Sequence, residues 1–534
     1  MNRKTLVLPA VVGLLAPALA ACGGSDSGSD GGDAIVVGTT DRFIATEDAP
    51  APLDPAYAYD VGTWNVLRQT VQTLMVQPRG DGEPVPEAAQ SCGFTDTGNE
   101  RYACKLRADL KFSNGDPVTA ADVKFSIDRA RAIKADSGVF ALLSTVDTVE
   151  TQGDNEVIFH LKTADATFPY KLSTPVAGIV NPDNYEKNKL REGFQIDGSG
   201  PYTLEAEEKN DELVRAEFTK NPHYKGALSV NNQEVDMVSY KDADAMGVAL
   251  DKGDIDMMTR SMTPEQIDKL SAASDSDVEL VEVPGLEIRY LAFNTDAPTV
   301  KDKAVRQAMA QIVNRSELIS KVYGSQAEPL YSLVPASVTG HSNAFFNKYG
   351  DPSVTKAKAL LTAADITTPV KLTLHYTTDH YGAATKKEFE QLQQQLNDSG
   401  LFDVSIEGTP WDTFVPAERN GEYDVFGMGW FPDFPDPDSF VAPFLDKDNF
   451  LKSPYANSEI RNSLIPESRR EADRLGAADS LNRIQDIVAE DVPMLPLWQG
   501  KQYVAARDDV TGVAYALNSS ATLQLWELSR GVSG

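Results

Sequence analysis

Hydrophobic and polar positions follow two different periods along the chain, which predicts a mixture of strands and helices. Residues 34–40 form a short apolar run that ends at two threonines, and this run predicts the first strand. Gly62 to Met75 carries apolar residues at a spacing of three and four, which predicts an amphipathic helix. Further strands are predicted at Tyr102 to Leu110 and from Tyr202 to Leu204. Helices and strands are therefore expected to be mixed along the chain.

Longer helical patterns follow in the second half of the chain. Asp302 to Ile319, Lys386 to Leu396 and Arg470 to Glu490 each place apolar residues on one face, and Leu475 belongs to the apolar face of the third. We therefore predict three continuous helices that pack against sheets. Nearer the N-terminus, the capping-box sequence from Thr119 to Asp122 predicts the start of another helix.

The N-terminus has the pattern of an export signal. Arg3 and Lys4 precede a short apolar run that ends in Leu-Ala-Ala-Cys at Cys22. The last four residues resemble the bacterial lipobox, in which the cysteine becomes lipidated. This resemblance predicts a signal peptide at 1–21, lipidation of Cys22, a flexible tether at 22–33 and a location on the outer face of the cell membrane. The alternative is a secreted protein with an incidental cysteine.

The composition narrows the classes of partner. The chain has 49 Lys and Arg residues against 79 Asp and Glu residues, a net charge of −30, so nucleic acid is not an expected partner. The acidic excess does not by itself indicate a ligand, because solvation of the surface is its commoner role. A length of 534 residues exceeds a single hydrophobic core and predicts two or three domains.

The remaining cysteines and the histidine pair are candidates for a disulfide and a metal site. Cys92 and Cys104 flank a Thr-Gly-Asn turn, so a disulfide across a hairpin is predicted outside the cell, worth about 3 kcal/mol. The alternative of a metal pair lacks a further His or Cys at ligand spacing. His375 and His380 flank Asp379, but their spacing misses one helical turn. No metal and no cofactor is predicted.

The segment 427–440 is the strongest candidate for a binding site. A predicted strand, Tyr423 to Phe426, runs into glycines and then into three alternating prolines, which predicts a stiff loop. The loop sets aromatic residues among carboxylates: Trp430, Phe431, Asp433, Phe434, Asp436, Asp438 and Phe440. Aromatic walls around a carboxylate suit a ligand with an ammonium group and an apolar body. The alternative is a Pro-rich surface turn with solvated aspartates.

Lys105 to Ser126 resembles the signature of the family 5 extracellular solute-binding proteins of ABC transporters, the oligopeptide- and dipeptide-binding lipoproteins. Further matching segments follow in order at 198–202, 220–224, 252–256, 290–295, 304–308, 429–433 and 491–498. The resemblance covers almost the whole chain after the leader.

This resemblance implies a two-lobe, periplasmic-binding-protein-like α/β fold with an extra inserted domain and a ligand cleft between the lobes. Lobe I would consist of residues 34–65, 190–290 and 500–534. The inserted domain would be 66–189, and lobe II would be 291–499. The protein would act as a monomer.

The resemblance also assigns roles to single residues. Asp433, three residues after the Gly-Trp pair, would bind the free α-amino group of a peptide. Trp430 and Trp411 would line side-chain pockets, although core packing is their alternative role. Phe431, from the aromatic loop itself, is a further candidate for ligand contact. Some oligopeptide binders have an arginine where this chain has Gly427, so carboxylate capture is open.

Arg419 is the candidate substitute for that arginine, with an exposed, uninvolved side chain as the alternative.

The implied function is capture of peptides and their delivery to the permease subunits of an ABC importer, without catalysis. Related proteins bind nickel complexes, oligosaccharides or haem, so a non-peptide solute is an alternative. A tethered hydrolase is disfavoured, because the chain has no Gly-x-Ser-x-Gly, no His-Glu-x-x-His and no cysteine beside a general base.

Overall fold

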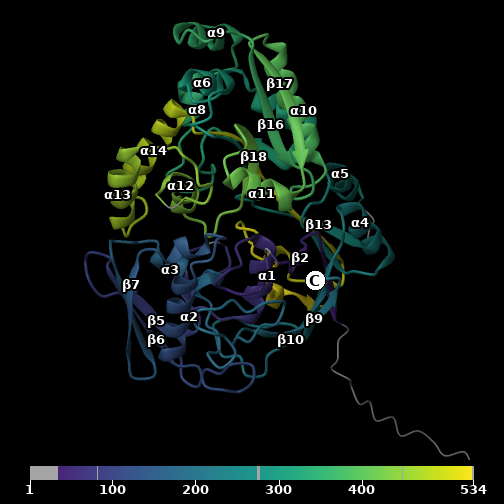
Figure 1. Ribbon diagram of the computed structural model, residues 1–534. Coiled ribbons are helices and arrows are strands. Elements are labelled where there is room, and N and C mark those ends of the chain that lie inside the picture. The colour runs from purple at the N-terminus through teal and green to yellow at the C-terminus, as the bar shows by residue number, and fades with distance from the viewer. Residues whose placement is uncertain (1–33, 48, 81, 274–276, 448, 532–534) are drawn as a thin grey trace, which may run out of the picture. The chain divides into compact units, whose positions relative to one another are not determined.

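The computed structural model describes residues 34–47, 49–80, 82–273, 277–447 and 449–531. The predicted signal peptide and tether, including Cys22, lie outside these residues. The fold is α/β, with three main sheets and helices packed on them (Figure 1). Among the described helices, none has the length and apolar character needed to cross a membrane.

Lobe I, as we use the name from here, is the eight-stranded sheet with helices α1, α4 and α5. The strand order is β13-β20-β12-β1-β11-β10-β2, with β9 paired to β10, and β1 runs parallel to both β11 and β12. The strands are β1 (Ile35–Thr39), β2 (Phe43–Ile44), β9 (Tyr202–Lys209), β10 (Glu212–Lys220), β11 (Glu234–Ser239), β12 (Met257–Thr259), β13 (Val278–Val283) and β20 (Gln502–Arg507). The helices are α1 (Val61–Thr70), α4 (Ala243–Lys252) and α5 (Pro264–Ala272). The strand predicted at 34–40 is β1.

The inserted sheet has four strands in the order β5-β6-β8-β7 and its own hydrophobic core. Its elements are β5 (Ala89–Phe94), β6 (Arg101–Leu106), β7 (Val146–Gln152), β8 (Glu156–Leu161), α2 (Ala120–Ile133) and α3 (Phe168–Lys171). Thr119 and Asp122 form the predicted capping box of α2. Cys92 and Cys104 are opposite one another on β5 and β6 and are joined by a disulfide. Beside this sheet, β3 (Met75–Val76) pairs with β4 (Val85–Pro86).

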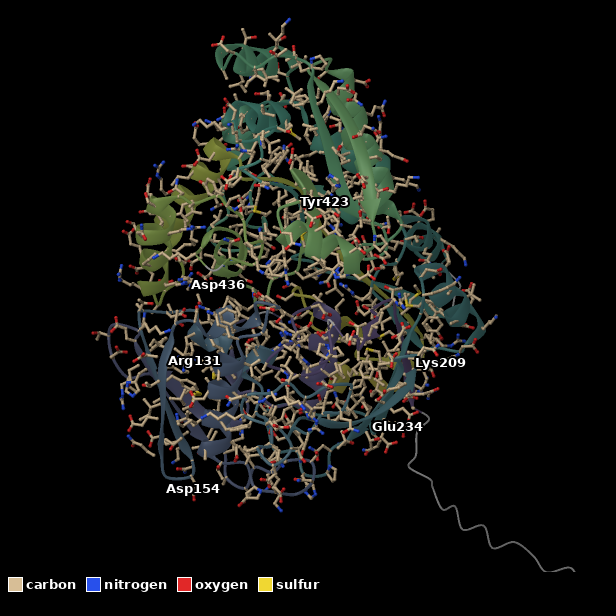
Figure 2. All side chains as sticks on the ribbon, in the orientation of Figure 1. Arg131, Asp154, Lys209, Glu234, Tyr423 and Asp436 are labelled. Carbon is tan, nitrogen blue, oxygen red and sulfur yellow. A yellow bond between two sulfur atoms is a disulfide. The ribbon has the colours of Figure 1, made fainter. Side chains whose placement is uncertain are left out.

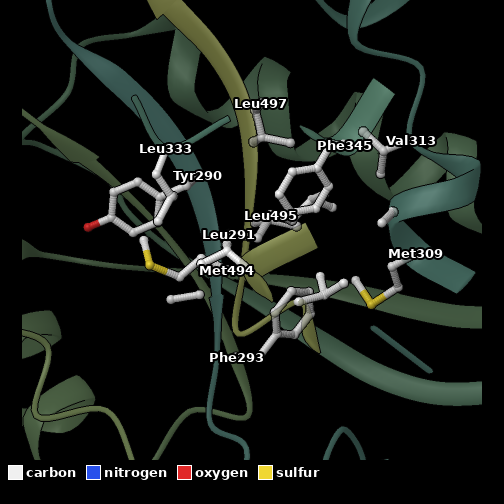
Figure 3. Packing of buried hydrophobic residues seen from close by; sticks show 14 of the residues in the cluster. Tyr290, Leu291, Phe293, Met309, Val313, Leu333, Phe345, Met494, Leu495 and Leu497 are labelled. Atoms are coloured by element: carbon white, nitrogen blue, oxygen red, sulfur yellow. The ribbon is translucent and has the colours of Figure 1, made fainter. Parts of the chain in front are cut away.

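Lobe II is the six-stranded sheet β15-β19-β14-β18-β16-β17 with helices α6 to α14, which occupies the upper half of Figure 1. The strands are β14 (Ile288–Phe293), β15 (Ala327–Pro329), β16 (Val370–Thr377), β17 (Phe402–Thr409), β18 (Val425–Trp430) and β19 (Met494–Gly500). The helices are α6 (Lys303–Ile312), α7 (Arg315–Val322), α8 (Ala344–Tyr349), α9 (Val354–Ala363), α10 (Ala384–Asp398), α11 (Trp411–Arg419), α12 (Asp438–Leu445), α13 (Ile465–Arg470) and α14 (Ala478–Asp491). Phe293, Leu495 and Met309, from β14, β19 and α6, belong to one buried core (Figure 3).

Two of the three long helices predicted for this lobe are interrupted. Asn314 separates α6 from α7, because its side chain accepts a hydrogen bond from the Glu317 amide and so starts a new helix. The prediction of one continuous helix from Arg470 to Glu490 is also wrong, since α13 ends at Arg470 and α14 starts at Ala478. Leu475, predicted to be in the core, lies between them and is 71% exposed. The helix predicted at Lys386 to Leu396 is α10.

The chain crosses between lobe I and lobe II at two neighbouring places. Residues 284–287 connect β13 to β14, and Lys501 alone connects β19 to β20. The two crossings touch: the Gly500 amide donates to the Glu287 carbonyl at 2.9 Å, and a side chain at Gly285 would overlap the Gly500 carbonyl. Contacts group residues 34–534 into one unit, so the domain boundaries given above stay a prediction.

Candidate functional site

The candidate loop follows strand β18 and lies between the lobes. The strand predicted at Tyr423 to Phe426 lies further along the chain, because β18 runs from Val425 through both glycines to Trp430. Both glycines allow close approach of neighbours: a side chain at Gly427 would overlap the Phe389 ring, and one at Gly429 would overlap the Arg289 guanidinium. Strand β18 therefore has no room for a cationic side chain at position 427.

Asp433 lies in the loop after β18 with its carboxylate buried. It is 8% exposed, and its amide donates to Ser439 Oγ at 2.9 Å. Its Oδ2 accepts a hydrogen bond from Tyr59 Oη at 3.2 Å. In the described part of the chain, no Lys, Arg or His nitrogen lies within 4.0 Å of this carboxylate. Burial raises the pKa of Asp433 to about 7, although the Tyr59 hydrogen bond and the charge of Arg68 pull the pKa the other way.

Trp430 forms a wall beside this carboxylate. Its indole Nε1 donates to the Ser439 carbonyl at 2.8 Å, which ties the end of β18 to the start of α12. The ring meets Tyr59 edge-on at 6.3 Å and lies 5.4 Å from the Phe450 ring, both measured between centroids. Trp430 thus packs in the core of lobe II and also borders the candidate site.

Trp411 begins α11 and supplies a second aromatic surface. Its ring stacks on His380 with centroids 3.8 Å apart, and its amide donates to Asp379 Oδ1 at 2.9 Å. Burial, together with the charges of Arg260 and Arg289, lowers the pKa of His380 to about 3, so this imidazole is neutral at pH 7.

His375, the other histidine of the pair, lies away from this stack. It packs on Tyr423 with centroids 4.1 Å apart. Over the described residues, no three His, Cys, Asp or Glu side chains are grouped to hold a metal ion.

Phe431 and Arg419 bring the site into contact with other parts of the molecule. The Arg260 guanidinium, from lobe I, lies 4.9 Å from the Phe431 centroid and pairs with Asp41 at 3.0 Å. Arg419, at the end of α11, donates through Nη1 to the Asp136 carbonyl at 3.3 Å. Arg419 is partly buried rather than fully exposed, and its Nε has no hydrogen-bond partner among the residues that the structure describes.

Three adjoining cavities lie along these residues, with volumes of about 850, 110 and 140 Å³. They adjoin because they share lining side chains: the first and second share Tyr59 and Asp433, and the second and third share Phe431. The structure brings all five predicted site residues to this run of cavities. Asp433 borders the first two, Trp430 and Trp411 the second, Phe431 the second and third, and Arg419 the first.

Several lining residues were missed by sequence reasoning: Tyr59, Arg68, Arg260, Tyr381 and Phe450. No local pattern marks them, because Tyr59, Arg68 and Arg260 meet the loop only through the packing of the lobes, and Tyr381 and Phe450 only through the fold of lobe II. Tyr59, for example, is 374 positions from Asp433. Its place after the extended segment that precedes α1 is the one signal available in the sequence.

The two lobes, the inserted sheet and the cavities between them define a solute-binding protein. Comparison with known families agrees: the model of the bacterial extracellular solute-binding proteins, family 5 (middle region), matches residues 83–452. The match covers more than half of the chain, and the chain belongs to this family.

Individual relatives span nearly the whole chain. The oligopeptide-binding protein OppA of Bacillus subtilis is 25% identical over 513 residues, covering 90% of this chain and 91% of its own. The DppA protein of Helicobacter pylori, solved with the peptide STSA, is 21% identical with a TM-score of 0.80, covering 93% of this chain and 98% of its own. AgaA of A. tumefaciens R10, solved with agropinic acid, is 22% identical with a TM-score of 0.80, covering 94% and 99%.

Proposed function

We propose that this protein captures peptides with a free N-terminus between its lobes and delivers them to the permease of an ABC importer. The observation that carries the proposal is the buried carboxylate of Asp433, which faces a cavity and has no cationic partner among the described residues. Membership of the solute-binding family and the oligopeptide- and peptide-binding relatives support a peptide as the solute.

The ligand's ammonium group would complete the environment of Asp433. A buried carboxylate without a partner is costly, and an ammonium group would restore the interactions lost on desolvation. Trp430, Trp411 and Phe431 offer apolar surface for the rest of the solute. A peptide in extended form would also bind through its backbone, which permits a broad range of side chains.

The site is divided between the lobes, which couples binding to closure. Tyr59 and Arg260 come from lobe I and the segment before α1, whereas Asp433 and Phe431 come from lobe II. A solute that contacts both sides stabilises the closed form, because the open form makes only half of these contacts. The closed form would be the one that the permease recognises.

The expected arrangement in the cell follows the lipobox resemblance: a monomer held on the outer face of the membrane by acyl chains on Cys22. Intact mass and N-terminal sequencing of the protein from its native host test this part. An unmodified Cys22, or a mature N-terminus elsewhere, would contradict it.

Calorimetry with trialanine and N-acetyl-trialanine tests the peptide assignment. Acetylation removes the ammonium charge, so we expect it to lower affinity by about two to three decades, or about 3–4 kcal/mol at 1.4 kcal/mol per decade. Asp433→Asn should lower the affinity for trialanine to a similar extent. Asp403→Asn, an exposed change on β17, is the matched control and should have no effect.

Equal affinities for the free and acetylated peptides would remove Asp433 from this role and favour a non-peptide solute, such as the agropinic acid seen in AgaA. Nickel complexes, oligosaccharides and haem would then be the next solutes to test. Mass spectrometry of the recovered peptides addresses the hydrolase alternative, because a binding protein returns every peptide intact.

A further inference from the structure

Phe434 extends from lobe II into the core of the inserted sheet. It follows Asp433 in the chain, yet it is 2% exposed and belongs to the hydrophobic cluster of the inserted sheet rather than to that of lobe II. Its ring stacks on that of Tyr170, from α3, with centroids 5.6 Å apart. Separation of lobe II from the inserted sheet would return this ring to water, which changes an equilibrium constant by about 10- to 100-fold.

Two hydrogen bonds join the inserted sheet to the last turn of α13. Asn99, in the turn between β5 and β6, donates through Nδ2 to the Arg470 carbonyl at 3.0 Å. The Ala166 amide donates to the Arg469 carbonyl at 2.8 Å. The last carbonyls of a helix have no partner within the helix. The C-terminal end of α13 is therefore capped in part by groups of the inserted sheet.

A buried cluster of charges crosses the same interface. Lys171, from α3, pairs with Asp165 at 2.7 Å and lies 4.0 Å from Asp438 of α12, and none of the three side chains is more than 4% exposed. Burial would raise the pKa of Asp165, but the charges of Lys171 and Arg469 outweigh it and lower that pKa to about 2. The charge of Asp165 is thus balanced in part by Arg469 of lobe II.

On its other side the inserted sheet is tied to lobe I by a stronger contact. Arg129, from α2, donates to both carboxylate oxygens of Asp54 at 2.8 and 2.6 Å, and the two side chains are 2% and 0% exposed. Asp54 lies in the segment that leads into α1. A buried bidentate pair of this kind is costly to break. Opening of the molecule would therefore separate the inserted sheet from lobe II, at the contacts of Phe434, Asn99 and Lys171.

We propose that Phe434, Asn99 and Lys171, with the partners named above, form a latch that holds lobe II against the inserted sheet whether or not a solute is bound. Every contact of the latch joins protein atoms to protein atoms, so none of them requires a ligand. The molecule opens only when the latch breaks, and the latch therefore limits the rates at which a solute enters and leaves. This role goes beyond capture at Asp433, because it also concerns the protein without solute.

Small-angle X-ray scattering of the full chain, with no peptide added, tests the latch independently of the solute. Phe434→Ala removes the ring from the inserted core, so we expect a larger radius of gyration than in the wild type, with an unchanged circular dichroism spectrum. Phe346→Ala, at a position on α8 that is 44% exposed, is the matched control and should keep the wild-type radius. Equal radii in Phe434→Ala and the wild type would overturn the proposal.

Asn99→Gly provides a second test with a milder change. Asn99 has a φ of 55°, which glycine adopts without strain, and it lines none of the three cavities, so the substitution removes the bond to Arg470 without altering the solute site. Stopped-flow measurements with trialanine should show association and dissociation rates that are both raised about two- to tenfold, with Kd unchanged within about twofold. Asn210→Gly, also at a φ of 55° but in the exposed turn between β9 and β10, is the matched control.

The two rates distinguish a latch that acts without solute from a contact that forms only in the complex. If Asn99→Gly raises the dissociation rate alone, the wild type is already open before it binds, and the proposal is overturned. Unchanged rates in Asn99→Gly overturn it as well.

The kinetic measurement rests on the proposed function, whereas the scattering measurement does not. If trialanine fails to bind the wild type while Phe434→Ala has the larger radius, the peptide assignment fails and the latch stands. If trialanine binds and the radius of Phe434→Ala is that of the wild type, the latch fails and the proposed function stands.

Discussion

Asp433, in the loop after β18, and Asp438, the first residue of α12, lie five residues apart and differ in their charged partners. Both are buried, at 8% and 3% exposure. Asp438 pairs with Arg469 at 2.8 Å and lies 4.0 Å from Lys171, whereas the Asp433 carboxylate accepts a hydrogen bond from the Tyr59 hydroxyl and has no cationic partner among the described residues. Burial would raise the pKa of Asp438, but the charges of Arg469 and Lys171 outweigh it and lower that pKa; the pKa of Asp433 is raised to about 7.

The difference separates carboxylates that hold the structure from one that is available to a solute. Lys171 ends α3 of the inserted sheet, so its approach to Asp438 joins that sheet to lobe II. Asp436 behaves like Asp438, because Arg474 binds it at 2.7 Å; it lies on the side of lobe II that faces the inserted sheet (Figure 2). Of Asp433, Asp436 and Asp438, Asp433 is the one that has no Lys, Arg or His nitrogen within 4.0 Å in the described part of the chain.

Removing the paired carboxylate of Asp438 should have the largest effect on the free energy of unfolding. Asp438→Asn leaves Arg469 and Lys171 buried with less compensation, so we expect the free energy of unfolding to fall by about 3–5 kcal/mol. Urea denaturation monitored by fluorescence measures this loss. Asp403→Asn is the matched exposed control, and a loss below about 1 kcal/mol in Asp438→Asn would mean that the network does not hold the interface.

Removing the unpaired carboxylate of Asp433 should instead raise the free energy of unfolding. The Asp433 carboxyl has a folded pKa of about 7, against about 3.9 in the unfolded chain. The ligand-free protein therefore loses stability as pH rises from about 4 to 7, and the loss is complete above pH 7. We expect Asp433→Asn to raise the free energy of unfolding by about 1–3 kcal/mol at pH 8.

At pH 4 the same substitution should change the free energy of unfolding little, because the carboxyl is then protonated in the folded chain. Urea denaturation at the two pH values gives the comparison. A destabilised Asp433→Asn at pH 8 would show that Asp433, like Asp438, supports the fold.

Peptide affinity should depend on pH through the same group. Below pH 7 the carboxyl of the free protein takes up a proton that an ammonium ligand must displace, so affinity should fall by up to about tenfold per unit between pH 7 and 5. Calorimetry with trialanine measures the profile. In Asp433→Asn the profile should be flat, and an unchanged slope there would assign the pH dependence to another group.

The smallest effect is expected from the hydroxyl that contacts Asp433. Tyr59→Phe removes the hydrogen bond to the carboxylate, worth about 0.5–1.5 kcal/mol, so affinity should fall about two- to tenfold. The pKa of Asp433 should also rise further, because this bond lowers it. Calorimetry with trialanine at pH 6 and 8 measures both changes, and Tyr515→Phe, an exposed position that lines none of the three cavities, is the control. Tighter binding in Tyr59→Phe would contradict this role.

The sequence predicts those features that depend on neighbours along the chain. The first strand, the capping box of α2 and the helix α10 each follow from local periodicity or a local hydrogen bond. The breaks after Ile312 and Arg470 escaped prediction, because the apolar spacing continues across them while Asn314 caps a new helix.

The residues of the candidate site likewise fall into those that the sequence predicts and those that it does not. Asp433 and its aromatic neighbours stand out because one loop supplies them, and the family resemblance assigns them a role. Tyr59 and Arg260 do not stand out, since only the packing of lobes brings them to the loop. Nor does periodicity distinguish Asp433 from Asp438, because their difference arises from the positions of Arg469 and Lys171.

The contact between residues 284–287 and Gly500 limits how the lobes can separate. Since both connections lie against each other, with the Gly500 amide bonded to the Glu287 carbonyl, a hinge motion of lobe II would have to take place at this one position. Gly285 allows this close approach, and a methyl group there would push the two backbones apart. A residue larger than glycine at position 285 would therefore disturb the place where both connections between the lobes meet.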